Sequence, residues 1–303
     1  MELGQARKLS YCGFSHRHPF ACDAYELGFA VGVREDYRFL DDGFPNVDLP
    51  VVFLDNQFDS PDLDRYLSKF ETYDPSVAVL GDAYNESEAK RLNETAIQLL
   101  EEHPWKEIIV VPKFEEAFEI LDHEVTLGYP NGYSELKPND YSSVRDWRGR
   151  KVHVLGGNPH SQFDVIEELT QPNLHMDPPA DIRGVDGNGL QKGAYFGEYW
   201  TPSGWEPADH LSIRETVRRS LEEVKEFWQG KGLWPDTEPI DLYGPAVIEP
   251  DDLIFMDKGG DPIPDREELE YAYIGEYLEY GKMAFQSEAQ KKFVEYREDF
   301  TPV

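Results

Sequence analysis

Three aspartates each follow an apolar run directly, and their types and positions point to carboxylate chemistry. Asp55 follows "VVFL", Asp82 follows "VAVLG" and Asp186 follows "DIRGV". A carboxylate at a strand end can act as a nucleophile, as a general acid or base, or as a hydrogen-bond acceptor for a substrate. Two carboxylates that face one anomeric carbon are enough for a double displacement at a sugar. Spacing alone does not separate these roles, and simple turn formation stays an equal alternative for each residue.

The elements that must position these aspartates are short apolar runs with helical or loop spacers between them. Each run is β-branched or apolar without strict alternation, which is typical of parallel strands buried on both faces. The runs span 8–15, 28–33, 49–56, 76–82, 107–113, 124–130, 151–157 and 180–186. Helical patterns fill 86–103, 114–122 and 161–170. This alternation predicts an α/β fold, a TIM-like (β/α)8 barrel, with a doubly wound sheet as the second choice. In a barrel, all the strand ends that carry aspartates gather on one face.

The pattern changes after Gly197. An aromatic, proline-containing loop (198–210) precedes an amphipathic helix (212–230), and a proline-rich stretch then leads to Tyr- and Glu-rich helices (265–300). We therefore expect a barrel over residues 1–230 and an acidic helical extension over 231–303. The extension either covers the barrel or offers a surface to a partner.

The charge of the chain is its most unusual bulk property. Of its 303 residues, 29 are basic and 60 are acidic, which gives a net charge of −31. The acids are spread over the whole chain, as in proteins of a salt-rich cytoplasm. Such a charge opposes nucleic-acid binding in dilute buffer. In molar salt, screening shortens to about 3 Å, and local basic clusters matter more than the total.

Targeting and redox signals are sparse. No run of about 18 apolar residues is present, so we expect no contact with a membrane. The N-terminus lacks the apolar centre of a signal peptide, and two cysteines are too few for a disulfide framework. These features predict a cytoplasmic protein.

Two neighbouring segments carry a family resemblance. "RKVHVLGGNPHSQFDVIEELT" followed by "ADIRGVDGNGLQKGAYFG" resembles the last barrel strands of tRNA-guanine transglycosylases. That family has a His-x-Leu-x-Gly strand with Gly and Pro after it, then a strand that delivers the nucleophilic aspartate. Upstream, "VVFLDNQF" resembles the strand of the family's acid/base aspartate. The resemblance covers roughly residues 8–230, and it implies that Asp186 is the nucleophile and Asp55 the acid/base.

The same resemblance implies the remaining contacts. The base-binding residues that it implies are Asp82, Asn56, Phe58, Gly128, Gly156, Gly157, Asn188, His16 and His18. Basic residues that could hold phosphates under it are Arg148, Arg150, Lys151 and Lys192, with ordinary surface ion pairing as their alternative.

The chain departs from the family in two ways. It lacks the cysteine-bearing zinc subdomain, and Lys113 stands where a glutamine motif is expected. The pattern is closer to the compact phage and archaeal-virus relatives that insert 7-deazaguanine bases into DNA. The implied activity is exchange of guanine in DNA, and less so in tRNA, for a 7-deazaguanine such as the 7-cyano form. Its partners are the nucleic acid and the free base, we expect no metal or cofactor, and a homodimer stays open.

Two alternatives remain at this point. His16 and His18 follow the first strand as the His-x-His of metal-dependent amidohydrolases does, and that class adds a lysine, two histidines and a late aspartate. This chain offers Lys113, His123, His153 and Asp186 for those places. The other alternative is a barrel without catalysis that only binds nucleic acid or a partner.

Overall fold

Each of the eight apolar runs forms a strand, and the parallel strands close into a barrel. The computed structural model describes residues 7–16, 20–36, 47–58, 60–132, 136–187, 189–208, 210–211, 213–248, 255–256 and 262–263. The barrel order is β1-β2-β4-β5-β6-β7-β8-β9, with β9 pairing back to β1. The strands are β1 (Tyr11–Ser15), β2 (Ala30–Arg34), β4 (Phe53–Asp55), β5 (Val77–Ala83), β6 (Glu107–Pro112), β7 (Thr126–Pro130), β8 (Lys151–Leu155) and β9 (Asp181–Asp186). The predicted TIM-like (β/α)8 barrel is confirmed.

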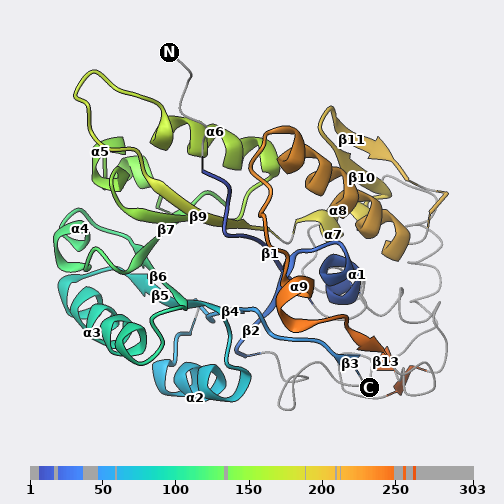
Figure 1. Cartoon of the computed structure of the whole chain (residues 1–303), viewed down its shortest axis with the longest axis horizontal. Coiled ribbons are helices and arrows are strands. Elements are labelled where there is room, and N and C mark those ends of the chain that lie inside the picture. The colour runs from blue at the N-terminus through green and yellow to red at the C-terminus, as the bar shows by residue number, and fades with distance from the viewer. Residues whose placement is uncertain are drawn as a thin grey trace.

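Helices alternate with these strands and lie around the outside of the barrel (Figure 1). They are α1 (Phe20–Glu26), α2 (Leu63–Tyr73), α3 (Glu86–Glu102), α4 (Ala117–Ile120), α5 (Val144–Trp147), α6 (Pro159–Thr170), α7 (Leu190–Tyr195), α8 (Ile213–Gly230) and α9 (Pro239–Tyr243), with a 3-10 turn at Pro138–Asp140. Asn85 and Asn158 start α3 and α6, because each side chain accepts from the backbone N–H three residues on. Helix α2, which the apolar pattern did not predict, is held in the same way by Asp62.

The segment after Gly197 differs from the expected loop. Strands β10 (Glu198–Thr201) and β11 (Gly204–Pro207) form an antiparallel hairpin, with Trp200 opposite Trp205. The tight turn is formed because Gly204 adopts a φ of 127°, which L side chains rarely reach. Four further short strands lie outside the barrel in two pairs. They are β3 (Val47–Asp48) with β12 (Val247–Ile248), and β13 (Phe255–Met256) with β14 (Pro262–Ile263).

The start of the expected C-terminal extension packs on the barrel. The Leu9 backbone N–H donates to the Leu233 carbonyl at 3.0 Å, and the Phe29 and Trp234 rings meet edge to face. The hydroxyl of Tyr25, on α1, donates to the Gly244 carbonyl at 2.7 Å. The helices expected over 265–300 lie outside the described residues.

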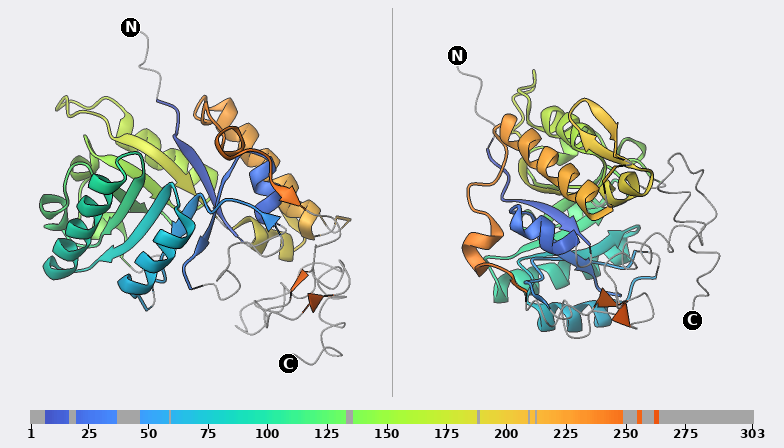
Figure 2. Two further views of the ribbon diagram at one scale, coloured as in Figure 1. Left: turned by 60° about the horizontal axis from the view of Figure 1, so that its bottom comes forward. Right: turned by 90° about the vertical axis from the view of Figure 1, so that its right-hand side faces the viewer.

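The hydrophobic core has two layers, as the strand pleat requires. Alternate strand residues point into the barrel, where Tyr11, Phe53, Val79 and Ile109 belong to one buried cluster. The other residues of each strand belong to the larger cluster that the helices cover. Figure 2 shows α8 lying alongside α1 on the outer side of β1.

The closure between β9 and β1 places Asp186 at the mouth of the barrel. Gly13 pairs with Asp186, and a Cβ on Gly13 would lie 2.9 Å from the Asp186 Cβ. A larger residue on β1 would therefore displace the carboxylate. The last strand can deliver its acid only because its neighbour is a glycine.

Candidate active site

Asp186 is held on one side of its carboxylate. His153 Nε2 lies 3.0 Å from Asp186 Oδ1, and the Gly156 backbone N–H donates to the same oxygen at 3.1 Å. Gln162 Nε2 donates to the backbone carbonyls of Asp186 and Gly156, at 2.6 and 3.0 Å. No described residue bonds Oδ2, and the side chain keeps 16% of its surface exposed. The arrangement fixes one oxygen and leaves the other to face a ligand.

His153 connects Asp186 to Tyr11. The Tyr11 hydroxyl lies 2.8 Å from His153 Nδ1, and the two rings stack with centroids 5.4 Å apart. Burial raises the pKa of Tyr11 well above its ordinary value, helped by the charges of Glu107 and Asp186, so the phenol keeps its proton. Because the Tyr11 hydroxyl keeps its proton, it donates a hydrogen bond to His153 Nδ1, and the His153 Nε2–H donates to Asp186 Oδ1. The three residues form a directional hydrogen-bond chain toward the carboxylate.

Asp55 has the opposite electrostatic setting. It ends β4, is half-buried, and accepts from the Asn56 backbone N–H at 2.9 Å. Burial raises the pKa of Asp55 to about 7, and the charge of Asp186 adds to the rise. The Asn56 N–H and Arg34 oppose it more weakly. A carboxyl group with this pKa can give and take a proton near neutrality, whereas hydrogen-bond donors hold one oxygen of Asp186.

The third aspartate, Asp82, is already paired. Lys113 Nζ lies 3.2 Å from Asp82 Oδ2, and the Tyr84 hydroxyl donates to the same oxygen at 3.1 Å. A register shift between Val79 and Gly81 precedes it on β5. Lys113 is only 7% exposed, so a cation stands beside this acid within the barrel mouth.

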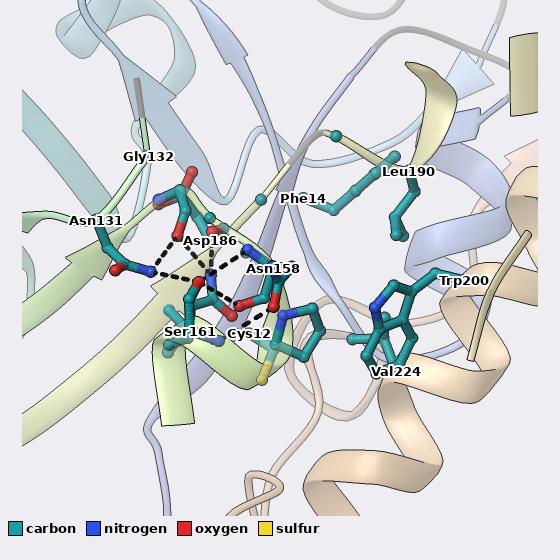
Figure 3. A pocket seen from close by; sticks show the side chains of 18 of the residues that line it. Cys12, Phe14, Asn131, Gly132, Asn158, Ser161, Asp186, Leu190, Trp200 and Val224 are labelled. Carbon is teal, nitrogen blue, oxygen red and sulfur yellow. Dashed lines mark hydrogen bonds between the residues drawn. The ribbon is translucent and has the colours of Figure 1, made fainter. Parts of the chain in front are cut away.

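A cavity of about 530 Å3 opens beside Asp186, within the usual size range of small-molecule sites. Figure 3 shows its two sides: Asn131, Asn158, Ser161 and Asp186 lie together, and apolar side chains lie across from them. We call it the Asp186 chamber. Its apolar wall is formed by Cys12, Phe14, Phe29, Leu190, Trp200, Leu221, Val224 and Trp228. One end can bind a polar group and the other can bury an apolar or aromatic one.

Two glycines shape the polar end of this chamber. Gly156 and Gly157 have φ angles of 67° and 83°, which favour glycine. A Cβ on Gly156 would lie 3.2 Å from the Gly132 Cα, so the two loops approach each other closely. The Asn131 amide donates to Gly156 O and to Ser161 Oγ across this contact.

Other predicted base contacts lie around the mouth. Asn56 is buried and Phe58 is 55% exposed, and both line a smaller pocket beside Asp55. His16 is buried at the end of β1, bonds Gln191 on α7, and stacks on Phe14. His18 and Asn188 lie outside the described residues.

The structure places Gly128 within the barrel wall, away from any pocket described here. A Cβ at this position would lie 2.7 Å from Leu155 Cδ1 and 2.8 Å from Val111 Cγ2. Dense packing of the barrel interior accounts for this glycine.

Three of the predicted phosphate contacts do not reach the face that carries Asp186. Lys151 begins β8, so Arg148, Arg150 and Lys151 lie at the strand's opposite end. Arg148 donates to the carbonyls of Leu169 and Asp177, Arg150 to those of Phe118, Leu121 and Asp122, and Lys151 pairs with Glu124. Both arginines are buried. Their placement corrects the sequence expectation, because these groups tie loops to the barrel. Lys192, on α7, is exposed and lines the Asp186 chamber.

Tyr11 and Gln162 are site residues that the sequence patterns did not indicate. Tyr11 reads as one more apolar residue of the first strand, and Gln162 as a polar residue of an amphipathic helix. The inward register of β1 could have flagged Tyr11, since a hydroxyl inside a barrel needs a polar partner.

Within the described ranges, no three His, Cys, Asp or Glu side chains come together as a metal site. His153, which the amidohydrolase alternative needs as a ligand, has its two ring nitrogens in contact with Tyr11 and Asp186. No helix in the described part of the chain combines the length and apolarity that a membrane crossing needs.

A family model described as "Family of unknown function (DUF6610)" matches residues 24–229, more than half of the chain. No curated protein matches. Among solved structures, the X-ray crystal structure of the YdjI aldolase from Escherichia coli K12 matches 74% of this chain and 92% of its own, with 10% identity and a TM-score of 0.45. A likeness at that level carries no argument, and the barrel rests on its own strand pairing.

Proposed function

This chain belongs to the family of unknown function DUF6610, and we propose that its barrel is a base-exchange glycosyltransferase. It replaces guanine in DNA, and less readily in tRNA, with a 7-deazaguanine such as 7-cyano-7-deazaguanine. The observation that carries the proposal is the pair Asp55 and Asp186. The pKa of Asp55 is raised to about 7 by burial and by the charge of Asp186. The Asp186 carboxylate is held by His153 and by the Gly156 backbone N–H.

The proposed reaction has two displacements at one carbon. The free Oδ2 of Asp186 attacks C1′ of the guanine nucleotide, the bond from C1′ to N9 breaks, and its electrons go to the departing base. Asp55, protonated, gives that base its proton. The incoming deazaguanine then loses its N9 proton to Asp55, attacks C1′ from the other side, and releases Asp186 as a carboxylate. Proton and charge are restored after one cycle.

The surrounding residues support these steps. The His153 Nε2–H stabilises the Asp186 carboxylate when it leaves in the second step, and Tyr11 keeps the ring oriented. The Asp186 chamber has room for a sugar and a flat base, with Gly156 and Gly157 allowing close approach to backbone. Lys192 lines the same chamber, and we propose that its ammonium group binds a phosphate of the nucleic acid. The target nucleotide must leave its helix to reach the aspartate.

Nucleoside mass spectrometry tests the proposal. Purified protein in molar salt is incubated with 7-cyano-7-deazaguanine and either duplex DNA or tRNA. We expect the deazaguanine nucleoside in DNA, and its loss in Asp186→Asn. The matched control is Asp181→Asn, at the other end of the same strand, where the carboxylate pairs with Arg7 and Arg183. Incorporation into tRNA alone would change the substrate, and no incorporation into either polymer would overturn the proposal.

A further inference from the structure

A second, smaller pocket of about 60 Å3 lies beside Asp55, outside the Asp186 chamber. The ends of β2, β4 and β5 and the first turns of α2 and α3 form its walls. We call it the Asn56 pocket. The lining residues used below are Glu35, Asn56, Phe58, Asp62, Asp82, Tyr84, Glu88 and Arg91.

Two buried polar groups in this pocket lack a partner. Asn56 is 6% exposed and Glu35 is 3% exposed. Asn56 Nδ2 and Glu35 Oε2 make no hydrogen bond to any described residue. The other carboxylate oxygen of Glu35 accepts from Arg65 at 2.8 Å. Buried polar groups in folded proteins are almost always bonded, because an unpaired one keeps its full desolvation cost. Both orphan groups line one pocket, and a ligand there would satisfy them.

The two unpartnered groups, Asn56 Nδ2 and Glu35 Oε2, define which hydrogen-bonding groups a ligand must offer. Asn56 Nδ2 requires an acceptor, and Glu35 Oε2 requires a donor. The volume accepts one polar edge of a ring and excludes a whole nucleoside. At the pocket, Phe58 and Tyr84 expose 55% and 53% of their surfaces, which is unusual for large aromatic residues. Rings at such a rim offer their faces to a planar ligand.

Charge excludes phosphate from the same place. Four carboxylates, from Glu35, Asp62, Asp82 and Glu88, line the pocket with the guanidinium of Arg91. Arg65 pairs with Glu35 and Lys113 with Asp82, so the carboxylates outnumber the nearby cations by one. A phosphate would be repelled, whereas a neutral base would not be. A guanidinium or ammonium group fits less well, because such a group has only donors and offers no acceptor to the Asn56 amide.

We propose that the Asn56 pocket binds the polar edge of an unpaired nucleobase next to the exchanged nucleotide, with Phe58 and Tyr84 against the faces of its ring. This assigns Asn56, Phe58 and Asp82, which the family resemblance gave to the exchanged base, to its neighbour instead. The Asn56 backbone N–H donates to the Asp55 carboxylate, so a base that binds Asn56 lies next to the residue that transfers the proton. The assignment rests on the proposed function for the identity of the polymer. It makes the substrate a strand whose neighbouring base is also unstacked.

Fluorescence anisotropy with a short labelled single strand in molar salt tests this site directly. The strand carries one guanine, and matched strands replace its 5′ or 3′ neighbour with an abasic residue. We expect Asn56→Ala, Glu35→Gln and Tyr84→Ala each to weaken binding of the intact strand by about tenfold. The same variants should bind one of the abasic strands as the wild type does. Trp105→Ala is the aromatic control, because Trp105 is 73% exposed in the turn before β6, at the other end of the barrel.

Thermal unfolding separates a ligand-binding role from a structural one. Removing an unpartnered donor relieves a desolvation cost, so Asn56→Ala should keep or raise the Tm of the free protein. A lowered Tm together with unchanged strand binding would overturn the assignment. Tighter binding of arginine amide than of the strand, lost in Glu35→Gln, would also overturn it in favour of a cation site. If the wild-type protein exchanges the base and the pocket variants bind the strand normally, this inference is wrong and the proposed function stands. If the pocket variants lose strand binding but the wild-type protein exchanges no base, the proposed function is wrong and this inference stands.

Discussion

His153 Nε2 lies 3.0 Å from Asp186 Oδ1 across the pair β8 and β9, and its other nitrogen meets Tyr11 on β1. The histidine side chain is fully buried. One imidazole ring thus connects the Tyr11 phenol, which keeps its proton, to the Asp186 carboxylate. The direction of this chain of hydrogen bonds leads to the first prediction.

Tyr11→Phe removes one hydroxyl and keeps the ring stack. Without the hydroxyl, His153 Nδ1 loses its hydrogen-bond donor, and the Asp186 contact is the remaining side-chain hydrogen bond that orients the ring. We expect kcat for base exchange to fall about tenfold to a hundredfold, with KM for the free base little changed. Steady-state kinetics check this. A rise in KM as large as the fall in kcat would point to general damage of the site. Tyr11→His, which keeps a polar ring, should retain a higher rate than Tyr11→Leu, and equal rates in the two variants would also point to general damage.

Under the proposed mechanism, Asp55 should control the pH dependence of the rate. Because its pKa is raised to about 7, the fraction of protein with a protonated Asp55 falls as pH rises through neutrality. We expect the first displacement, measured as release of labelled guanine in a single turnover, to decline above about pH 7. Asp55→Asn should abolish this limb of the profile and lower the rate at least a hundredfold. An unchanged limb in Asp55→Asn would assign the titration to another group.

The same shift predicts an effect on stability. The folded-state pKa of Asp55 lies above the ordinary value of 3.8, so the native state holds this proton more tightly. The resulting stabilisation is complete below about pH 4 and is lost as pH rises through about 7. Asp55→Asn should therefore raise the free energy of unfolding at pH 8 by roughly 1–3 kcal/mol and change it little at pH 4. Urea unfolding at the two pH values measures it, and a uniform change at both would refute the linkage.

Substitution of Arg150 should lower stability, whereas substitution of Lys192 should weaken strand binding. Arg150 is 4% exposed and donates to three backbone carbonyls, so Arg150→Met should cost about 2–4 kcal/mol of stability. Lys192 is exposed beside the Asp186 chamber, so Lys192→Ala should leave the Tm unchanged and weaken binding of a single strand. Thermal unfolding and anisotropy on both variants give the comparison. Strand binding that depends on Arg150 at constant stability would return that residue to the nucleic-acid surface.

Local sequence determined the barrel and the ends of its strands. Each apolar run is long enough to pack on both faces, and each of the three aspartates directly follows such a run. Strand closure then had to bring Asp55 and Asp186 to one rim, because the ends of parallel strands meet there. The fold and this pair were therefore predictable from residues that are close in the chain.

Only the tertiary structure decided which neighbours those aspartates have. Tyr11 and His153 are separated by 142 positions, and their contact depends on the inward register of two strands on either side of β9. Arg148 and Arg150 read as a basic cluster, yet they precede β8 and so lie at the other end of the barrel from Asp186. The orphan groups of Glu35 and Asn56 became visible once β2, β4, α2 and α3 enclosed them. Sequence reports which residues follow a strand, but burial and pairing depend on what the folded chain brings from elsewhere.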